Sequence, residues 1–474
     1  MTAISKKAYW VLFFSVIVLS GILLTFRLGS EPFIDYDEAS YASIIDSTLE
    51  SGDLSVPRML KEPSFEKPPL YYWLAMGSGR IFDHKEFAYR LPAALFGVLS
   101  VALVMLIVLE VSGSFGASLF AGLILLTSGL YFEAARQVRL DVPVTACILF
   151  SVLCFIKGWK NPKWYFGMGI GLGLGVMFKG AIGLLAIPIV FIWALCVTNW
   201  GWLRSRYTWL GAIAAILIAV PWHWRETLLF GNAFWDKYVG FNILTRLGSN
   251  IMNNQGSAYG YSKELGWTLL PWSVAFVVAV AATIRRVLVS LEKIRENPLV
   301  APVLVSLFII ALFLSSQTKL LYYFIPAAPF MAICVALLVW QIMLSPKVSA
   351  KAVVSVSALF LVAGLAMMVY IGYDKYPNLS TWVQVAREER DVGRLVAAEP
   401  VDSFYVFQYP FSETLRYYSG NKPIIQLSEG DAINPPMLIV VPAMFYASKP
   451  FSPALQSRMI VKHEGESSVL LRID

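Results

Sequence analysis

The sequence predicts a mainly α-helical, polytopic membrane protein, and three observations lead to this fold class. Hydrophobic residues make up 57% of the 474-residue chain, whereas soluble domains contain roughly 45–50% apolar residues. The mean hydropathy is +0.64. Apolar runs also recur between short polar breaks, and a helix needs about 20 such residues to cross a bilayer.

About eleven transmembrane helices are expected, in the order in which the apolar runs follow one another. The first run follows Lys6 and Lys7, but it is long and no small-residue cleavage site follows it, so we expect a signal anchor instead of a cleaved signal peptide. The four cysteines fall within the runs and indicate no disulfide framework. The runs are residues 9–26, 92–110, 115–132, 142–156, 164–178, 181–197, 207–222, 265–284, 299–315, 320–344 and 352–373.

The basic residues between the runs indicate how the chain is oriented. Lys and Arg gather before the first run and in alternate breaks, which are 157–163, 204–206, 285–295 and 347–351. The positive-inside rule assigns these breaks, and the N-terminus, to the cytoplasm. The net charge of +7 therefore reflects cytoplasmic loops and not a surface that binds nucleic acid. Three large segments are then expected outside the cytoplasm, namely 27–91, 223–264 and the tail from 374.

Two of the outward segments contain predicted secondary structure. A helix is expected to begin at Glu38, with Asp37 as its cap, and to stop at Gly52. Its apolar stripe is typical of a helix that lies on the membrane surface. The tail has the composition of a soluble domain, so the chain divides into a transmembrane unit, 1–373, and a small extracytoplasmic α/β domain, 374–474. The expected elements of that domain are a helix at 381–398 and strands at 403–408, 423–427 and 437–442.

Charged side chains cluster on the outward face. An acidic group follows the first run, and basic and acidic residues stand at the outward ends of later segments; together these are Asp35, Asp37, Glu38, Lys67, Asp141, Lys179 and Lys319. A solvated loop with a helix cap explains the acidic group alone, and snorkelling explains a single lysine. Anchoring lysines belong on the cytoplasmic face, however. The cluster therefore favours an anionic ligand with a reacting hydroxyl nearby, such as a lipid-linked phosphate.

A series of motifs in a fixed order resembles a known family of membrane enzymes. The motifs are DYDEASYA, SGDLSVPRMLKEPSFEKPPLYYW, RLPAALFG, RLDVP, FKGAIGLL, LLPW and SQTKLLYYFIPAAP, within about the first 330 residues. The chain is similar to the GT-C glycosyltransferases related to aminoarabinose transferases of lipid A and, more distantly, to protein O-mannosyltransferases. The resemblance implies an enzyme that transfers a sugar from a polyprenyl phosphate, undecaprenyl phosphate in bacteria, to an acceptor on the outer side of the bacterial inner membrane.

The resemblance also assigns roles to individual residues. Asp37 and Glu38 match the catalytic acidic pair of the family, and Tyr41 occupies its tyrosine position. Asp141 and Lys179 match further polar positions of the site.

Cations are expected around the donor phosphate, because its charge grows as the bond to the sugar breaks. Lys67 matches the lysine that contacts this phosphate in the family, and Lys319 and Arg246 are further candidates. An alcohol acceptor must lose a proton, which Asp37 is suited to accept, and direct displacement inverts the sugar carbon. Tyr322 and Tyr323 are expected in the interfacial aromatic belt, with lipid or sugar contact as the alternative.

The sequence does not decide whether the protein has a site for a divalent metal such as zinc, magnesium or manganese. Glu66 matches a metal-contacting glutamate of the arabinose transferases, but Asn242 stands where those enzymes have a histidine ligand. His223 is the alternative ligand, although a lone histidine at a membrane boundary is more often a hydrogen-bonding residue. No other cofactor is indicated.

Several functions remain in competition at this point. The expected acceptor is lipid A or another surface glycolipid or glycan, and a protein acceptor is the alternative. A lipid or solute transporter would place ionisable groups near the bilayer midplane and would show two related halves. A glycan polymerase or ligase on another membrane fold would share the carrier lipid but lack the DE and EKPP motifs. The sugar, the acceptor, the oligomeric state and the role of the tail domain stay open.

Overall fold

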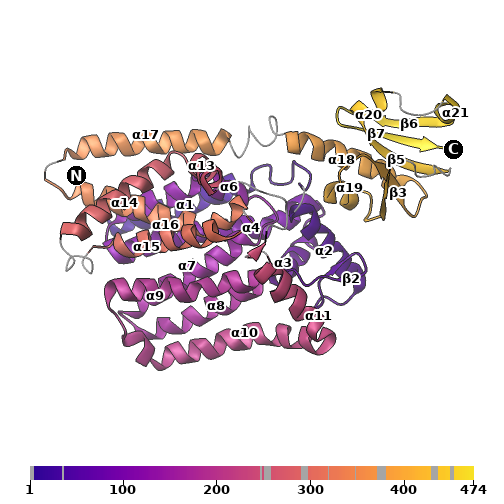
Figure 1. Ribbon diagram of the computed structural model, residues 1–474. Coiled ribbons are helices and arrows are strands. Elements are labelled where there is room, and N and C mark those ends of the chain that lie inside the picture. Colours follow the sequence, from indigo (N-terminus) through magenta and orange to yellow (C-terminus); the bar gives the residue numbers. More distant parts are fainter. Residues whose placement is uncertain are drawn as a thin grey trace.

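The computed structural model describes most of the chain, and three of the charged residues singled out in the sequence fall outside that part. The described residues are 5–34, 37–245, 248–249, 258–289, 297–318, 320–346, 348–370, 381–428, 436–448 and 453–474. Asp35, Arg246 and Lys319 lie outside them. Figure 1 shows long helices that run side by side in a bundle, with a small domain containing a sheet at the end where α2 and α3 also lie.

The bundle confirms a mainly helical protein with several candidate membrane spans. Its principal helices are α1 (Lys6–Thr25), α4 (Lys85–Ser112), α5 (Phe115–Leu126), α7 (Asp141–Gly158), α8 (Tyr165–Lys179), α9 (Ala186–Val197), α10 (Arg206–Phe230), α13 (Ala258–Thr268), α14 (Trp272–Val289), α15 (Val300–Ser315), α16 (Ala327–Met343) and α17 (Ala350–Val369). Each apolar run predicted from the sequence overlaps at least one of them.

Fewer helices than expected meet a strict test of length and composition. Among the described residues, six helical segments are long and apolar enough to cross a membrane, or seven if a pair bent by 108° counts as one span. The pair is Gly260–Thr268 with Trp272–Leu288. Three further apolar helices, α5, α15 and α16, are shorter. The helix α7 lies at the centre, with 89% of its residues buried, so the residues at its ends are enclosed by protein.

A sharp reversal separates α8 from α9. Gly180 has a φ of 55°, a conformation that glycine adopts without a steric penalty. A Cβ added to Gly183 would lie 2.2 Å from the carbonyl carbon of Gly175, although eight residues of straight helix span about 12 Å. The two helices therefore double back on each other, and the turn between them carries Lys179.

The first segment predicted to face outward, 27–91, folds into compact structure. It contains α2 (Asp37–Ser51), a pair of short antiparallel strands, β1 (Arg58–Met59) and β2 (Glu62–Pro63), and α3 (Leu70–Gly79). The predicted helix agrees with α2 at both ends, and its expected stripe, including Tyr41, Ile44 and Ile45, is buried. That stripe faces protein, because α2 packs on α3 and on α19 (Glu413–Tyr418).

The tail forms a mixed sheet flanked by helices. The helix α18 (Thr381–Ala398) and the strands β3 (Phe404–Phe407), β4 (Ile424–Leu427) and β5 (Met437–Pro442) coincide with the predicted elements. The sheet order is β4-β3-β5-β7-β6, with β3 parallel to both neighbours and with β7 antiparallel to both of its own. The sequence analysis missed the hairpin of β6 (Met459–Glu464) and β7 (Ser468–Ile473). The edge strand β6 is largely exposed and polar, so it lacks the apolar alternation of a half-buried strand.

The tail domain is docked on the chain segment that leads into α2. The backbone N–H of Phe33 donates to the Tyr418 hydroxyl at 3.0 Å, and the Thr414 hydroxyl donates to the Phe33 carbonyl at 3.2 Å. Arg387 forms a two-pronged ion pair with Glu31 at 2.7 and 2.8 Å. In Figure 1, α19 lies beside α2. The domain therefore braces the entrance to the helix that begins with Asp37.

Candidate active site

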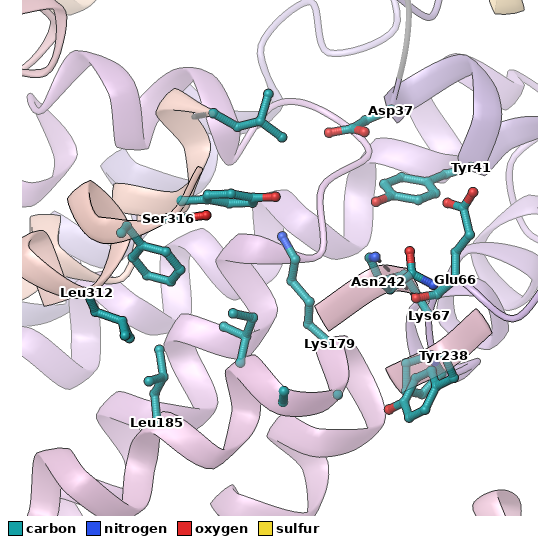
Figure 2. Close-up of a pocket in the computed structure, with 17 residues that line it drawn as sticks. Asp37, Tyr41, Glu66, Lys67, Lys179, Leu185, Tyr238, Asn242, Leu312 and Ser316 are labelled. Atoms are coloured by element: carbon teal, nitrogen blue, oxygen red, sulfur yellow. Dashed lines mark hydrogen bonds between the residues drawn. The ribbon is translucent and has the colours of Figure 1, made fainter. Parts of the chain in front are cut away.

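A pocket of about 230 Å³ opens between the first outward segment and the bundle, and Figure 2 shows its lining side chains. Seven predicted site residues line it, namely Asp37, Tyr41, Glu66, Lys67, Lys179, Asn242 and Tyr323. The other lining residues are Pro68, Gly180, Ala181, Ile182, Leu185, Tyr238, Leu312, Phe313, Ser316 and Leu320. The pocket thus has a charged end near α2 and an apolar end between the α8–α9 reversal and α15.

Asp37 lies at the charged end, on the first turn of α2. Its Oδ2 accepts a hydrogen bond of 2.8 Å from Nη1 of Arg139. Burial raises the pKa of this carboxyl, but the neighbouring positive charges, led by Arg139, outweigh it and hold the pKa below its usual value of 3.8. The side chain is 43% exposed and lines the pocket. Asp37 is therefore an ionised carboxylate, and its Oδ1 has no hydrogen-bond partner among the described residues.

Arg139 is the principal residue of the site that sequence reasoning missed. Its guanidinium donates to Gln137 at 2.6 Å and lies 3.2 Å over the ring of Tyr322. The Tyr322 hydroxyl in turn donates to Glu133 at 2.7 Å. The motif RLDVP could have revealed Arg139. It places an arginine at the end of a span that the sequence predicts to face outward, where the positive-inside rule does not favour basic residues.

Lys179 enters the pocket from the reversal after α8 and is paired behind the wall with Asp141. The distance from Lys179 Nζ to Asp141 Oδ1 is 2.5 Å. Asp141 is the first residue of α7 and is 5% exposed, and it does not line the pocket. The pair therefore holds the end of α8 against the start of α7 and leaves the ammonium at the pocket surface.

Glu66, Lys67 and Asn242 form another wall of the pocket. Pro68 and Pro69 follow Lys67, and a proline restricts the residue before it to extended backbone. The Lys67 ammonium donates to the Glu66 carbonyl at 3.1 Å. The Asn242 side chain donates to the carbonyl of Phe65, next to Glu66, at 3.4 Å. In Figure 2 these three residues lie together, across the pocket from Leu185 and Leu312.

Tyrosines complete the charged end. Tyr41 is buried beneath Asp37, and burial followed by the charge of Asp37 raises the pKa of its phenol well above the usual value. Tyr41 therefore stays protonated and can donate a hydrogen bond into the pocket. Tyr323 also lines the pocket, whereas Tyr322 stacks on Arg139 and is not among the lining residues.

Glu38 lies away from the pocket. Its carboxylate is 2% exposed and accepts two hydrogen bonds from Arg90, at 2.9 and 2.8 Å, one from the Val138 backbone at 2.7 Å and one from the Ile34 backbone at 3.2 Å. Arg90 also donates to three backbone carbonyls, those of Leu28, Glu31 and Pro32. Glu38 therefore joins α2 to α4 and to the chain ahead of α7, which fixes the position of its neighbour Asp37.

Comparisons with known proteins find related sequences and folds. A family model described as dolichyl-phosphate-mannose-protein mannosyltransferase matches residues 66–224. The chain is 27% identical over 272 residues to the undecaprenyl phosphate-alpha-4-amino-4-deoxy-L-arabinose arabinosyl transferase of Enterobacter sp., a match that covers 55% of this chain and 48% of the relative. The chain spans about half the length of the curated arabinosyl transferases that it matches.

The fold likeness extends over nearly the whole chain. The crystal structure of ArnT from Cupriavidus metallidurans bound to undecaprenyl phosphate superposes with a TM-score of 0.76 at 20% identity and covers 98% of both chains. This chain therefore has the fold of ArnT and is similar in sequence to the arabinosyl transferases. The oligosaccharyltransferase AglB from Archaeoglobus fulgidus, in complex with an inhibitory peptide and a dolichol-phosphate, shares the fold more distantly, with a TM-score of 0.58 at 13% identity over 93% of this chain and 70% of AglB.

The predicted metal ligands do not assemble into a metal site in this GT-C fold. Glu66 and Asn242 line the pocket, but His223 does not. His223 Nε2 lies 3.0 Å from the Tyr238 hydroxyl and Nδ1 lies 2.8 Å from the Ala219 carbonyl, so both ring nitrogens have partners. Within the part of the chain that the structure describes, no group of three or more His, Cys, Asp or Glu side chains could hold a metal ion.

Proposed function

We propose that this chain is a membrane glycosyltransferase that moves a sugar from a polyprenyl-phosphate-linked donor to an acceptor outside the cytoplasmic membrane. In a bacterium the carrier is undecaprenyl phosphate, and the acceptor is lipid A or another surface glycolipid. The observation that carries the proposal is one pocket in which an ionised carboxylate, two lysines and an apolar wall meet. A polyprenyl phosphate has matching parts, because it joins an anionic headgroup to a hydrocarbon chain.

The two ends of the pocket suit the two parts of the donor. Lys67 and Lys179 supply positive charge to the phosphate, and a compact ammonium suits a phosphate charge. The apolar lining, which includes Ile182, Leu185 and Leu312, takes the first isoprene units. Arg139 and Asp141 act from outside the pocket by holding Asp37 and Lys179 in place.

The chemistry is a displacement at the sugar carbon that carries the phosphate. An acceptor oxygen forms a bond to that carbon while the bond from the carbon to the phosphate oxygen breaks. The bonding electrons leave on the phosphate, where the lysines stabilise the growing charge. Asp37 Oδ1 accepts the proton of the acceptor hydroxyl. Attack from the side opposite the phosphate inverts the configuration of the sugar carbon.

The proposal includes a topology that follows from the basic loops. The N-terminus is cytoplasmic, and the pocket and the tail domain, 374–474, lie on the outer side. Eleven crossings result if α8 and α9 count separately and if the three shorter apolar helices also span. The pocket then sits at the outer membrane boundary, where the headgroup of a carrier lipid lies.

The deciding experiment compares membrane glycolipids by mass spectrometry in a strain that lacks the gene. We expect one glycolipid to lose the mass of a sugar and to regain it when the wild-type gene is supplied. Asp37→Asn should not restore it, whereas Asp83→Asn, an exposed acid outside the pocket, should. An unchanged glycolipid profile would refute the lipid acceptor. The description of the matched family favours a protein acceptor as the second candidate, and loss of glycan mass from envelope proteins would support it.

A further inference from the structure

The amide of Asn242 presents an unsatisfied acceptor at the pocket. Its Nδ2 donates to the Lys237 carbonyl at 2.8 Å and to the Phe65 carbonyl at 3.4 Å. Two carbonyl partners fix which side of the amide carries the nitrogen. Its Oδ1 is buried and has no hydrogen-bond partner among the described residues. Buried polar atoms are nearly always paired, so an orphan at a pocket wall points to an absent ligand.

The backbone that carries Asn242 is unusual. Asp236–Thr245 forms a π-helix, η4, a geometry that is rare and is frequently found at functional sites. The side chains of Asn242 and Thr245 each donate to the carbonyl five residues earlier, at 2.8 and 3.0 Å. These bonds tie the amide nitrogen to η4 itself, which leaves the oxygen in a fixed position.

A second orphaned group lies close to Glu66. The Tyr72 hydroxyl is buried without a hydrogen-bond partner in the described residues, and Tyr72 is 1% exposed. Burial, followed by the charges of Glu66 and Asp37, raises the pKa of this phenol well above its usual value. Tyr72 therefore stays protonated near both carboxylates. Glu66 is thus bordered by an unsatisfied acceptor, Asn242 Oδ1, and by an unsatisfied hydroxyl.

The polarity of this wall selects the kind of group that it binds. The Glu66 carboxylate and Asn242 Oδ1 both accept hydrogen bonds, so they repel a phosphate and attract O–H or N–H groups. Lys67, the next residue along the chain, carries a positive charge that attracts the phosphate. In a polyprenyl phosphate sugar the sugar ring is bonded directly to the phosphate. A phosphate at Lys67 therefore brings the sugar next to Glu66 and Asn242.

We propose that Glu66 and Asn242 form the sugar-recognition wall of the pocket and bind a hydroxyl or a protonated amine of the donor sugar. This inference rests on the proposed function, because it names the part of the donor that the wall contacts. Asn242 fixes the orientation of the sugar through its orphaned oxygen. Glu66 determines whether a charged amine is favoured over a neutral hydroxyl.

The test separates binding of the sugar from binding of the carrier. Purified protein in detergent is titrated with undecaprenyl phosphate, with the carrier bearing an amino sugar and with the carrier bearing a neutral hexose. We expect Asn242→Ala to bind bare undecaprenyl phosphate within about twofold of wild type and to lose roughly tenfold or more in affinity for at least one sugar-bearing carrier. Thr245→Val is the matched control on the same π-helix, because Thr245 does not line the pocket.

Glu66→Gln identifies the recognised group. It keeps the size of the side chain and one acceptor oxygen but removes the charge. A loss confined to the amino-sugar carrier indicates recognition of a protonated amine, and an equal loss for both sugar-bearing carriers indicates a hydroxyl.

Several outcomes would overturn the inference. If Asn242→Ala weakens the binding of bare and sugar-bearing carriers equally, the wall stabilises the fold or binds the phosphate. The same conclusion follows if Thr245→Val shows the same losses of affinity as Asn242→Ala. Unchanged affinities in both site variants would mean that the orphaned oxygen binds no part of the donor. If EDTA abolishes the difference in affinity between the sugar-bearing carriers, Glu66 binds a metal ion instead of the sugar. If wild-type protein binds none of the three lipids, the proposed function fails before this inference is reached.

Discussion

Arg139 donates a hydrogen bond of 2.8 Å to the carboxylate of Asp37, across 102 residues of sequence. The guanidinium is held in turn by Gln137 and by the face of Tyr322. One carboxylate oxygen of Asp37 is thereby fixed, and the other is left for an acceptor. This ion pair fixes the orientation and the charge of the carboxylate that we propose as the base.

Asp37→Asn tests the role of this base. The substitution keeps the shape of the side chain but removes the proton acceptor. If the acceptor is an alcohol, we expect turnover to fall by at least about a hundredfold while affinity for undecaprenyl phosphate stays near the wild-type value. Turnover is measured with purified enzyme in detergent. Unchanged turnover would reduce Asp37 to a structural residue at the start of α2.

Arg139→Gln should change the pH dependence of the reaction. The pKa of Asp37 lies below 3.8 because the positive charges outweigh burial. Activity that needs the carboxylate is therefore complete above that pKa and is lost as the pH falls through it. Burial raises the pKa of Asp37, and removal of the guanidinium takes away the main positive charge that counteracts this effect. The pKa of Asp37 should therefore rise, and the acid limb of a plot of kcat against pH should move to higher pH. An acid limb at the wild-type position would show that Arg139 does not control Asp37.

Lys67→Ala should weaken the binding of the carrier lipid. Hydrogen bonds to charged groups are worth about 1.5–3 kcal/mol, so we expect a loss of roughly ten- to a hundredfold in affinity for undecaprenyl phosphate. Lys61→Ala, in the same outward segment but outside the pocket, is the control. Normal binding by the Lys67 variant together with lower stability would make EKPP a structural loop.

Lys179 and Asp141 should behave as a buried ion pair in unfolding experiments. Their side chains are 12% and 7% exposed, and removal of one partner leaves an uncompensated charge, which costs about 3–5 kcal/mol. Lys179→Met should therefore lower the thermal unfolding temperature in detergent clearly. Adding Asp141→Asn to that variant should recover much of the loss. A double variant as unstable as the sum of the single variants would argue against direct coupling.

Tyr418→Phe tests whether the tail domain positions Asp37. The substitution removes the acceptor for the Phe33 backbone N–H and the donor to Glu86, and a buried unpaired group costs about 1–3 kcal/mol. We expect kcat to fall several-fold with little change in KM for the donor. Tyr405→Phe is the control, because its hydroxyl makes no hydrogen bond within the described residues. A fall in stability with an unchanged kcat would limit the domain to a structural role.

The sequence alone determined the elements that depend on local pattern. Apolar runs of sufficient length predicted the helices of the bundle, and the stripe from Tyr41 to Ile45 predicted α2. Short apolar runs predicted β3, β4 and β5. Asp37 and Lys67, which line the pocket, could also be named in advance, because the motifs that contain them resemble those of a known family.

Only the tertiary structure decided which charges meet and which face the pocket. Glu38 follows Asp37 directly, but successive helical residues point about 100° apart, so one lines the pocket and the other binds Arg90. The pairing of Asp37 with Arg139 and the bracing of Phe33 by Tyr418 join segments 102 and 385 residues apart. No local pattern encodes such contacts, because they arise only when packing of the apolar helices brings distant segments together.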